Sequence, residues 1–145
     1  PMGFCLYHKR GKLSIMTDLG YVSDKIKGQV RESDVLICEA NHDIEMLRMG
    51  RYPWNVKRRI LSDVGHLSNE EAGDALLDIL DSRCQDVYLA HLSRDNNMID
   101  LARMTVSQKL QEAGVDVGKE VKLHDTYHDR PTPLAELPQR SLLGR

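Results

Sequence analysis

Four polar side chains are spaced along this sequence at the ends of strand-like runs or before a helix-like run. Asp18 follows the run LSIMT, Glu39 ends the run DVLICE, and His91 follows the run DVYLA. His66 comes shortly before a helix-like segment that starts at Ser68. Carboxylates and neutral imidazoles bind divalent metals, and an imidazole oriented by a carboxylate can transfer a proton. This series of residues therefore indicates metal-assisted hydrolysis.

Each of these residues also has a structural interpretation when it is taken alone. Asp18 can cap its own turn, and His91 can be a buried, hydrogen-bonded histidine. His66 can sit near a helix cap without any chemical role. In the segment Glu39 to Asp43, His42 could ligate a metal or be structural, and Asp43 can cap the next helix. Residue types and spacing leave these alternatives open.

A basic cluster with two aromatic neighbours, Tyr52 and Trp54, could hold a phosphate backbone. Its members are Arg48, Arg51, Lys57, Arg58 and Arg59. The alternative is a solvated helix face. The net charge of −2 gives no basic footprint of the kind common in nucleic-acid-binding proteins. A nuclease is still compatible with this charge, because bound cations can attract phosphate locally.

The pattern of apolar residues predicts strands alternating with helices, and hence an α/β fold. Strands are expected at 3–7, 12–17, 34–39, 86–90 and 121–124. Helices are expected at 24–30, 43–49, 53–61, 68–80 and 97–113. Loops at the ends of strands are where α/β proteins assemble their sites, and the polar motifs fall there. Residues 1–130 are expected to form the folded part, and 131–145 an irregular, proline-containing tail.

Cysteine usage and apolar runs bear on the cellular compartment. The three cysteines, Cys5, Cys38 and Cys84, are widely spaced, and the first two lie in apolar runs. Reduced thiols and a cytoplasmic protein are therefore expected. The sequence contains neither a signal peptide pattern nor an apolar run long enough to cross a membrane.

Three strings of this sequence together resemble the YycJ/WalJ-type family: TDLGYVSD, YLAHLSRDNN, and the long central string CEANHDIEMLRMGRYPWNVKRRILSDVGHLSNEEA. These are bacterial metal-dependent hydrolases of the metallo-β-lactamase superfamily, related to ribonuclease Z and the β-CASP nucleases. The resemblance covers about residues 1–125 and implies the C-terminal half of an αββα sandwich. It also implies an exonuclease acting on DNA 5′ ends, with two divalent metals, zinc or manganese, in the parent enzyme.

The resemblance assigns a role to each of the four polar residues. Asp18 matches the aspartate that bridges the metals, and His91 matches the last histidine ligand. Glu39 and His66 match a pair in which the histidine protonates the leaving oxygen. These roles agree with the chemistry expected from the residue types.

The superfamily signature HxHxDH does not occur in this sequence, nor does the isolated histidine expected between it and Asp18. We therefore expect a fragment that lacks the N-terminal half of the site, holds metal at low occupancy and is inactive alone. Its partners are expected to be nucleic acid as substrate, the missing N-terminal half, and a second copy through a bared sheet face. A non-catalytic binding or assembly module is the alternative function.

Overall fold

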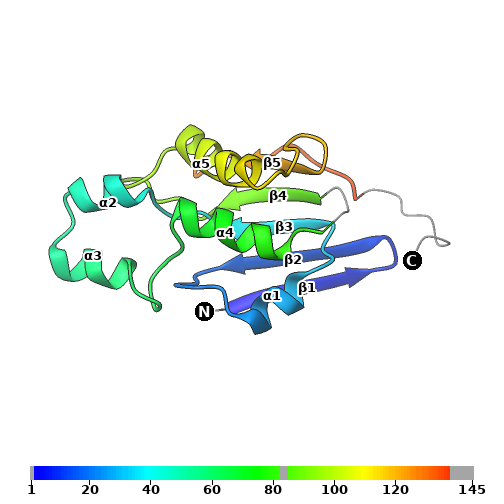
Figure 1. Ribbon diagram of the computed structural model, residues 1–145, viewed down its shortest axis with the longest axis horizontal. Coiled ribbons are helices and arrows are strands. Elements are labelled where there is room, and N and C mark those ends of the chain that lie inside the picture. Colours follow the sequence, from blue (N-terminus) through cyan, green and yellow to red (C-terminus); the bar gives the residue numbers. More distant parts are fainter. Residues whose placement is uncertain (1, 82–84, 138–145) are drawn as a thin grey trace.

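The computed structural model describes residues 2–81 and 85–137 (Figure 1), so the predicted thiol at Cys84 lies outside the described residues. The strands are β1 (Met2–His8), β2 (Gly11–Thr17), β3 (Val35–Glu39), β4 (Gln85–Ala90) and β5 (Val121–Asp125). The helices are α1 (Asp24–Val30), α2 (Ile44–Met49), α3 (Trp54–Ile60), α4 (Asn69–Ile79) and α5 (Ile99–Glu112). No helix in the described ranges has the length and apolar character that crossing a membrane requires.

The strands form one sheet in the order β1-β2-β3-β4-β5. The hairpin β1-β2 is antiparallel, and β2, β3, β4 and β5 pair in parallel. Parallel neighbours require crossover connections, which here contain helices. The predicted α/β class is confirmed. Because β2, β3 and β4 run in the same direction, their carboxyl ends lie at the same edge of the sheet.

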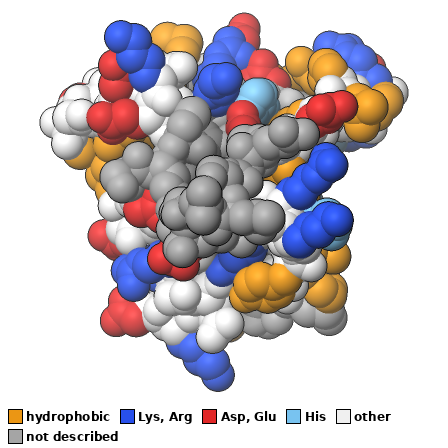
Figure 2. Space-filling model, turned by 90° about the vertical axis from the view of Figure 1, so that its right-hand side faces the viewer, with side chains coloured by type: hydrophobic (Ala, Val, Ile, Leu, Met, Phe, Trp, Pro, Cys, Tyr) orange, Lys and Arg blue, Asp and Glu red, His pale blue; other side chains and the backbone are white. Residues whose placement is uncertain are grey.

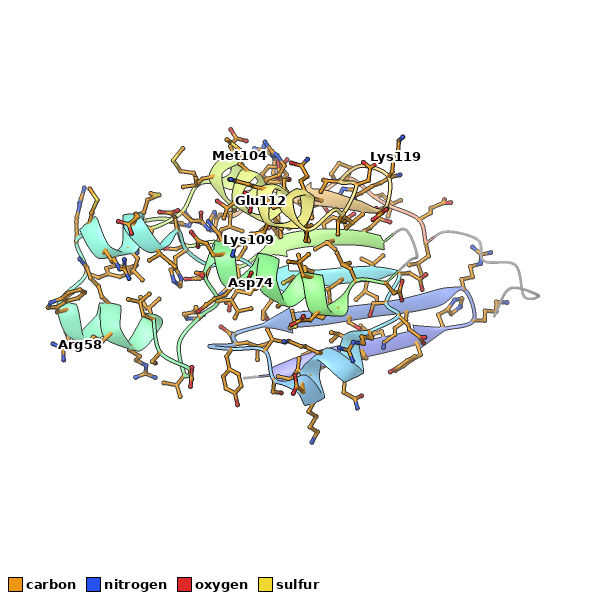
Figure 3. All side chains as sticks on the ribbon, in the orientation of Figure 1. Arg58, Asp74, Met104, Lys109, Glu112 and Lys119 are labelled. Carbon is orange, nitrogen blue, oxygen red and sulfur yellow. The ribbon has the colours of Figure 1, made fainter. Side chains whose placement is uncertain are left out.

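The main core lies between the sheet and the helices α1, α4 and α5, which cover one face (Figure 1). Alternate residues of the strands point to this face, including the fully buried Leu36, Cys38 and Val87. They pack in one cluster with Leu76 of α4 and Val106 of α5. An ion pair between Lys109 Nζ and Asp74 Oδ1, 3.0 Å apart, joins α5 to α4 at the surface (Figure 3). These contacts fix the positions of the strand ends.

The opposite face of the sheet carries a row of apolar residues in neighbouring strands. Phe4, Ile15 and Ile37 are in register across this face, followed by Tyr88. Phe4 is 54% exposed. Residues 132–137 share a cavity of about 390 Å³ with this face. Residues 131–137 of the predicted tail form no helix or strand, and 138–145 lie outside the described residues. Self-association through this face stays a prediction, which sedimentation velocity can test.

Local capping signals fix where the helices begin. Ser23, Asp43 and Ser68 each accept a hydrogen bond from the backbone N–H three residues later. At Ser68 the side chain of Glu71 completes a capping box. The predicted helix from Asn97 begins instead at residue 99, because Met98 is the N-cap and its backbone is extended, with φ −139° and ψ 142°. The short helices α2 and α3 project beyond the carboxyl ends of the strands (Figure 1).

Candidate metal centre

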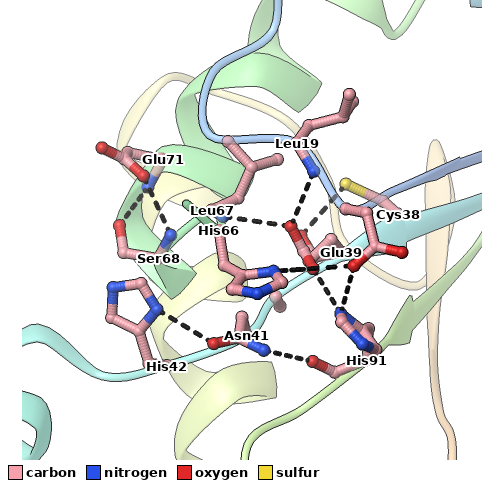
Figure 4. A network of polar contacts seen from close by, with 12 residues as sticks. Leu19, Cys38, Glu39, Asn41, His42, His66, Leu67, Ser68, Glu71 and His91 are labelled. Atoms are coloured by element: carbon pink, nitrogen blue, oxygen red, sulfur yellow. Dashed lines mark hydrogen bonds and ion pairs between the residues drawn. The ribbon is translucent and has the colours of Figure 1, made fainter. Parts of the chain in front are cut away.

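The fold brings four residues from four segments together at the carboxyl edge of the sheet. Asp18 follows β2, Glu39 is the last residue of β3, His91 follows β4, and His66 precedes α4. One potential ligand atom of each residue lies within 4.8 Å of those of the others. Figure 4 shows three of these residues, Glu39, His66 and His91, converging with Glu39 at the centre.

Glu39 is the buried centre of the group, with no exposed surface. Its Oε1 atom lies 3.0 Å from Nδ1 of His66 and 2.5 Å from Nδ1 of His91. Its Oε2 atom accepts hydrogen bonds from the backbone N–H groups of Leu19 (3.3 Å) and Leu67 (3.1 Å). Because an ionised carboxylate only accepts, both rings carry their proton on Nδ1. When the rings are neutral, each Nε2 atom is therefore free to bind a metal.

The other three residues are more accessible than Glu39. The side chains of Asp18, His91 and His66 are 63%, 46% and 32% exposed. The Asp18 Oδ1 atom lies 3.8 Å from Nδ1 of His66 and 3.7 Å from Nδ1 of His91. The two rings are 5.2 Å apart between centroids and tilted by 54°. The site thus has a buried carboxylate behind an accessible carboxylate and two accessible imidazoles.

Asp18 and His91 share an unusual backbone conformation. Both have a φ angle of 58°, in the left-handed region. A residue with a side chain held there costs on the order of 1–3 kcal/mol and needs support from its surroundings. Each is the residue directly after its strand, so this conformation turns the chain sharply where the strand ends. Glu32, in the turn before β3, has a similar φ of 60°, so the conformation alone does not mark the site.

These donors fit a divalent metal. A carboxylate with two imidazoles is a ligand set for zinc or manganese, and a carboxylate commonly holds the second nitrogen of a metal-binding imidazole. Glu39 is placed to do this for both rings. The metal-binding roles predicted for Asp18 and His91 stay predictions, as do the catalytic roles of Glu39 and His66. Nδ1 of His66 faces Oε1 of Glu39, as Nδ1 of His91 does.

A groove of about 570 Å³ opens beside the group. It is lined by Asp18 and His66 on one side and by residues of α3 and the following loop, including Asn55, Arg59 and Asp63, on the other. Of the five basic residues predicted to bind substrate, Arg59 is the one that lines this groove. A guanidinium beside a metal-binding group can hold a phosphate oxygen.

The other basic residues of the cluster have different environments. Lys57 is 8% exposed, its ammonium donates to the Arg48 carbonyl at 2.6 Å, and it lies 5.5 Å from the Trp54 ring centroid. These contacts support a packing role between α2 and α3 for Lys57. Arg58 lies at the outer side of α3, away from the sheet (Figure 3). Arg48 and Arg51 are exposed.

The opposite end of the molecule gives a contrasting surface. There, basic and acidic side chains are interspersed around the residues that are not described (Figure 2). This mixture is typical of a solvated surface. The groove beside α3 differs from this surface, because Arg59 lines the same space as Asp18 and His66.

Two structural elements of the site were missed by the sequence analysis. Asn69 and Asn97 exchange a pair of side-chain hydrogen bonds, each 2.9 Å long, and Asn97 also donates to the Ala40 carbonyl. Asn41 donates to the His91 carbonyl. Both contacts join segments far apart in the sequence, so residue spacing carries no signal for the pairings. For Asn41, the indication in the sequence was its position in the polar segment that follows β3.

His42 lies behind the site, outside the converging group. It is 1% exposed, and its Nδ1 atom lies 3.3 Å from Asn41 Oδ1. Burial, and to a smaller extent the nearby His66, lower the pKa of the His42 imidazole to about 4, against the opposing effects of Glu39 and Asp43. His42 is therefore neutral at physiological pH.

The lowered pKa of His42 predicts a specific pH dependence of stability. Between about pH 6.5 and 4 the unfolded chain binds a proton at this position and the folded protein does not, so stability decreases as the pH falls through this window. The loss is about 3 kcal/mol from this residue. Urea unfolding of wild type and His42→Asn at pH 6.5, 5.5 and 4.5 measures it as the difference between the two. Parallel pH profiles would contradict the prediction.

Gly65 allows the chain to place His66. A Cβ atom at Gly65 would lie 2.2 Å from the Ile60 carbonyl oxygen and 2.3 Å from that of Arg59. The backbone N–H of His66 donates to the same Ile60 oxygen at 3.1 Å. The carbonyl groups at the end of α3 cannot move without shifting His66.

Gly65→Ala is accordingly expected to lower the free energy of unfolding by about 1–3 kcal/mol, as overpacked sites do. Gly28→Ala in α1 is the matched control, because a Cβ there has nothing within 4 Å. It is expected to stabilise the protein by about 0.5–1 kcal/mol. Urea unfolding of both variants measures these changes, and equal stability of Gly65→Ala and wild type would refute the argument.

Comparison with known proteins extends these observations. No protein-family model matches the chain. The chain is 52% identical over 134 residues to exodeoxyribonuclease YycJ of Bacillus anthracis, covering 92% of this chain and 51% of that protein. It is 48% identical over 123 residues to exodeoxyribonuclease WalJ of Streptococcus pneumoniae, covering 85% of this chain and 46% of that protein. The chain spans about half the length of these relatives. Over most of its length, the chain is therefore homologous to the YycJ/WalJ-type proteins.

Proposed function

We propose that this chain is the C-terminal half of a metal-dependent phosphodiesterase, an exonuclease that acts on DNA ends. The observation that carries the proposal is the buried Glu39 carboxylate, which holds two accessible histidines by Nδ1 next to Asp18. The relatives' printed name, exodeoxyribonuclease, supports DNA as the substrate. The groove lined by Arg59 supports an anionic substrate.

In this proposal Asp18 and His91 hold divalent metal, and His66, held by Glu39, supplies a proton to the substrate. A bound metal supplies Lewis-acid stabilisation of the phosphate and a more acidic water. His66 donates a proton from Nε2 to the leaving oxygen. Glu39 holds Nδ1–H of the same ring and stabilises the imidazolium before transfer, as the carboxylate of other carboxylate–histidine pairs does.

An N-terminal half is expected to complete the site. The metal ligands that the superfamily supplies through HxHxDH are expected in an N-terminal half that packs on the open sheet face, which carries Phe4, Ile15 and Ile37. Burial of an exposed apolar sheet face is favourable in proportion to its area. We also propose a cytoplasmic location, which the free thiols Cys5 and Cys38 of the described residues support.

A cleavage assay with the full-length protein that carries this sequence tests the proposed function. The substrate is 5′-labelled duplex DNA, with manganese or zinc. Asp18→Ala and His66→Ala are expected to lower kcat by about 10²–10⁴-fold, the range for loss of a proton donor or of an electrostatic group in the transition state. Full activity in both variants would reject the assigned roles.

Arg59 and Arg58 form a matched pair for testing the groove, because they are neighbours on one helix and only Arg59 lines it. Arg59→Ala is expected to weaken DNA binding and to reduce the slope of log K against log salt by about 1, as loss of one phosphate contact does. Arg58→Ala is expected to leave the slope unchanged. Fluorescence anisotropy with labelled duplex DNA at several salt concentrations measures the slope for both variants. Equal effects of the two substitutions would contradict a role of the groove in DNA binding.

A further inference from the structure

We propose that Asn41 is a positioning residue, which fixes His91 at the carboxyl end of β4 and is itself aligned by the buried His42. The inference rests on the proposed function for its meaning, since His91 matters there as a metal-binding residue. Its geometry rests on hydrogen bonds that are independent of any metal.

Asn41 connects three loops of the site through its backbone and side chain. Its N–H donates to the Leu67 carbonyl at 2.9 Å, and its carbonyl accepts from the Ser93 N–H at 2.6 Å. Its side-chain Nδ2 donates to the carbonyl of His91 at 2.8 Å (Figure 4). The segments after β3, before α4 and after β4 are therefore tied at one residue.

The bond to His91 acts on a strained residue. His91 has a φ of 58°, a conformation that costs on the order of 1–3 kcal/mol for a residue with a side chain. The Asn41 amide holds the carbonyl of that residue, and Glu39 holds its ring. If the amide is lost, the backbone of His91 can relax out of the left-handed region. The ring would then leave Glu39, because the direction of the Cα–Cβ bond changes with the backbone.

The chemistry of the contacts sets the orientation of the Asn41 amide. The His91 carbonyl only accepts, so the amide nitrogen must face it and Oδ1 must face His42. Nδ1 of His42, 3.3 Å from Oδ1, therefore carries the proton. The lowered pKa of the buried His42 keeps the ring neutral. Its Nε2 atom is then an unprotonated acceptor.

That Nε2 atom gives the second observation. Within the described ranges it is buried and has no hydrogen-bond partner. A buried polar atom without a partner costs about 1–3 kcal/mol. An apolar residue at position 42 would avoid this cost, but it would remove the protein donor to Asn41 Oδ1. The unpartnered Nε2 atom of His42 therefore lowers stability, whereas the Nδ1–H group of the same ring keeps the amide of Asn41 aligned.

The test uses the full-length protein with ¹⁵N-labelled histidine and long-range ¹H–¹⁵N NMR spectra, with the His91 signals assigned by a His91→Gln variant. Wild type is expected to show a single Nδ1-protonated pattern for His91. Asn41→Ala is expected to lose that pattern. Asn41→Asp, which keeps the size and the acceptor toward His42 but places an oxygen against the His91 carbonyl, is expected to lose it as well. This second variant decides the question if Asn41→Ala does not fold.

Ser14→Ala is the matched control, because Ser14 is a buried polar residue of β2 whose side chain contacts Ser33 and Cys5. It is expected to lower stability and leave the His91 pattern unchanged. His42→Asn, which restores a donor toward Oδ1, is expected to keep the pattern, and His42→Leu is expected to lose it. An unchanged His91 pattern in both folded Asn41 variants would overturn the proposal.

Zinc titration of the same proteins separates this inference from the proposed function. The Kd for zinc is expected to rise about 10–100-fold in Asn41→Asp, the range for residues that orient a metal-binding imidazole. If wild type binds no zinc but Asn41→Asp still alters the His91 pattern, the proposed metal site fails and the positioning role stands. If wild type binds zinc and Asn41→Asp changes neither the Kd nor the pattern, the positioning role fails alone.

Discussion

Glu39→Gln is expected to lower the kcat of cleavage strongly and to move the ring proton of both His66 and His91 from Nδ1 to Nε2. In the present structure Oε2 of Glu39 faces two buried backbone N–H groups, and Oε1 faces the two Nδ1 atoms. Leaving a buried N–H unpaired costs about 1–3 kcal/mol, so the glutamine oxygen is expected to stay on the backbone side. The amide NH₂ then faces both rings.

The NH₂ group of the glutamine sets the tautomer of both rings. An NH₂ group can only donate, so Nδ1 of each ring has to accept and the proton of the neutral ring goes to Nε2. A protonated Nε2 cannot bind metal, and a His66 ring without a carboxylate on Nδ1 loses the group that stabilises its imidazolium. The substitution changes one atom and inverts the hydrogen-bonding roles of two histidines.

The expected magnitude is a loss of about 10²–10⁴-fold in kcat, measured with 5′-labelled duplex DNA on the full-length protein. Long-range ¹H–¹⁵N NMR spectra of the histidines report the tautomers directly. Glu112→Gln is the matched control, since Glu112 is the exposed last residue of α5 and its side chain contacts Gln108 of the same helix (Figure 3). Retained activity together with Nδ1-protonated rings in Glu39→Gln would contradict the proposed role of Glu39.

This chain alone is expected to hold little metal and to show no measurable cleavage, whereas the full-length protein that carries it is expected to be active. Asp18 and His91 provide two predicted metal-binding side chains, with His66 alongside them. Metal affinity depends strongly on the number and geometry of ligands, and two metals need more than these. The relatives are about twice as long as this chain, which leaves room for the other ligands.

The measurement is elemental analysis of dialysed protein, followed by the cleavage assay with manganese or zinc. Addition of a separately produced N-terminal half to the chain is expected to restore both metal content and activity. Asp18→Ala in the chain is the control, since restoration should fail without this residue. Two tightly held metals per chain in the absence of the other half would contradict the prediction.

Local sequence patterns predicted the elements well, because the information is local. The continuous apolar run before Glu39 became β3, and Ser23 and Ser68 cap α1 and α4 through their own side chains. Hydrophobic periodicity and capping depend on residues within one or two turns of each other. The end of β3 at Glu39 and the start of α4 near Ser68 were therefore accessible without a fold.

The environments of the five basic residues depend on tertiary structure. Five cations within twelve positions looked equivalent in the sequence. In the structure Arg59 lines the groove, whereas Lys57 is buried and donates to the carbonyl of Arg48 in α2. Lysine can bury its aliphatic stem while its ammonium finds an acceptor, so charge alone does not predict exposure. The packing of α3 in the fold decides which of these side chains lines the groove, and residue spacing does not contain it.

For the site itself, the sequence determined which residue types stand at the ends of β2, β3 and β4, and a family resemblance assigned roles to Asp18, Glu39, His66 and His91. Only the tertiary structure decided that one buried carboxylate serves two histidines, and that Asn41 reaches the His91 carbonyl fifty residues away. The physical reason is that parallel strands place distant residues side by side at one edge. Hydrogen bonds across that edge depend on register and backbone direction, which no local pattern contains.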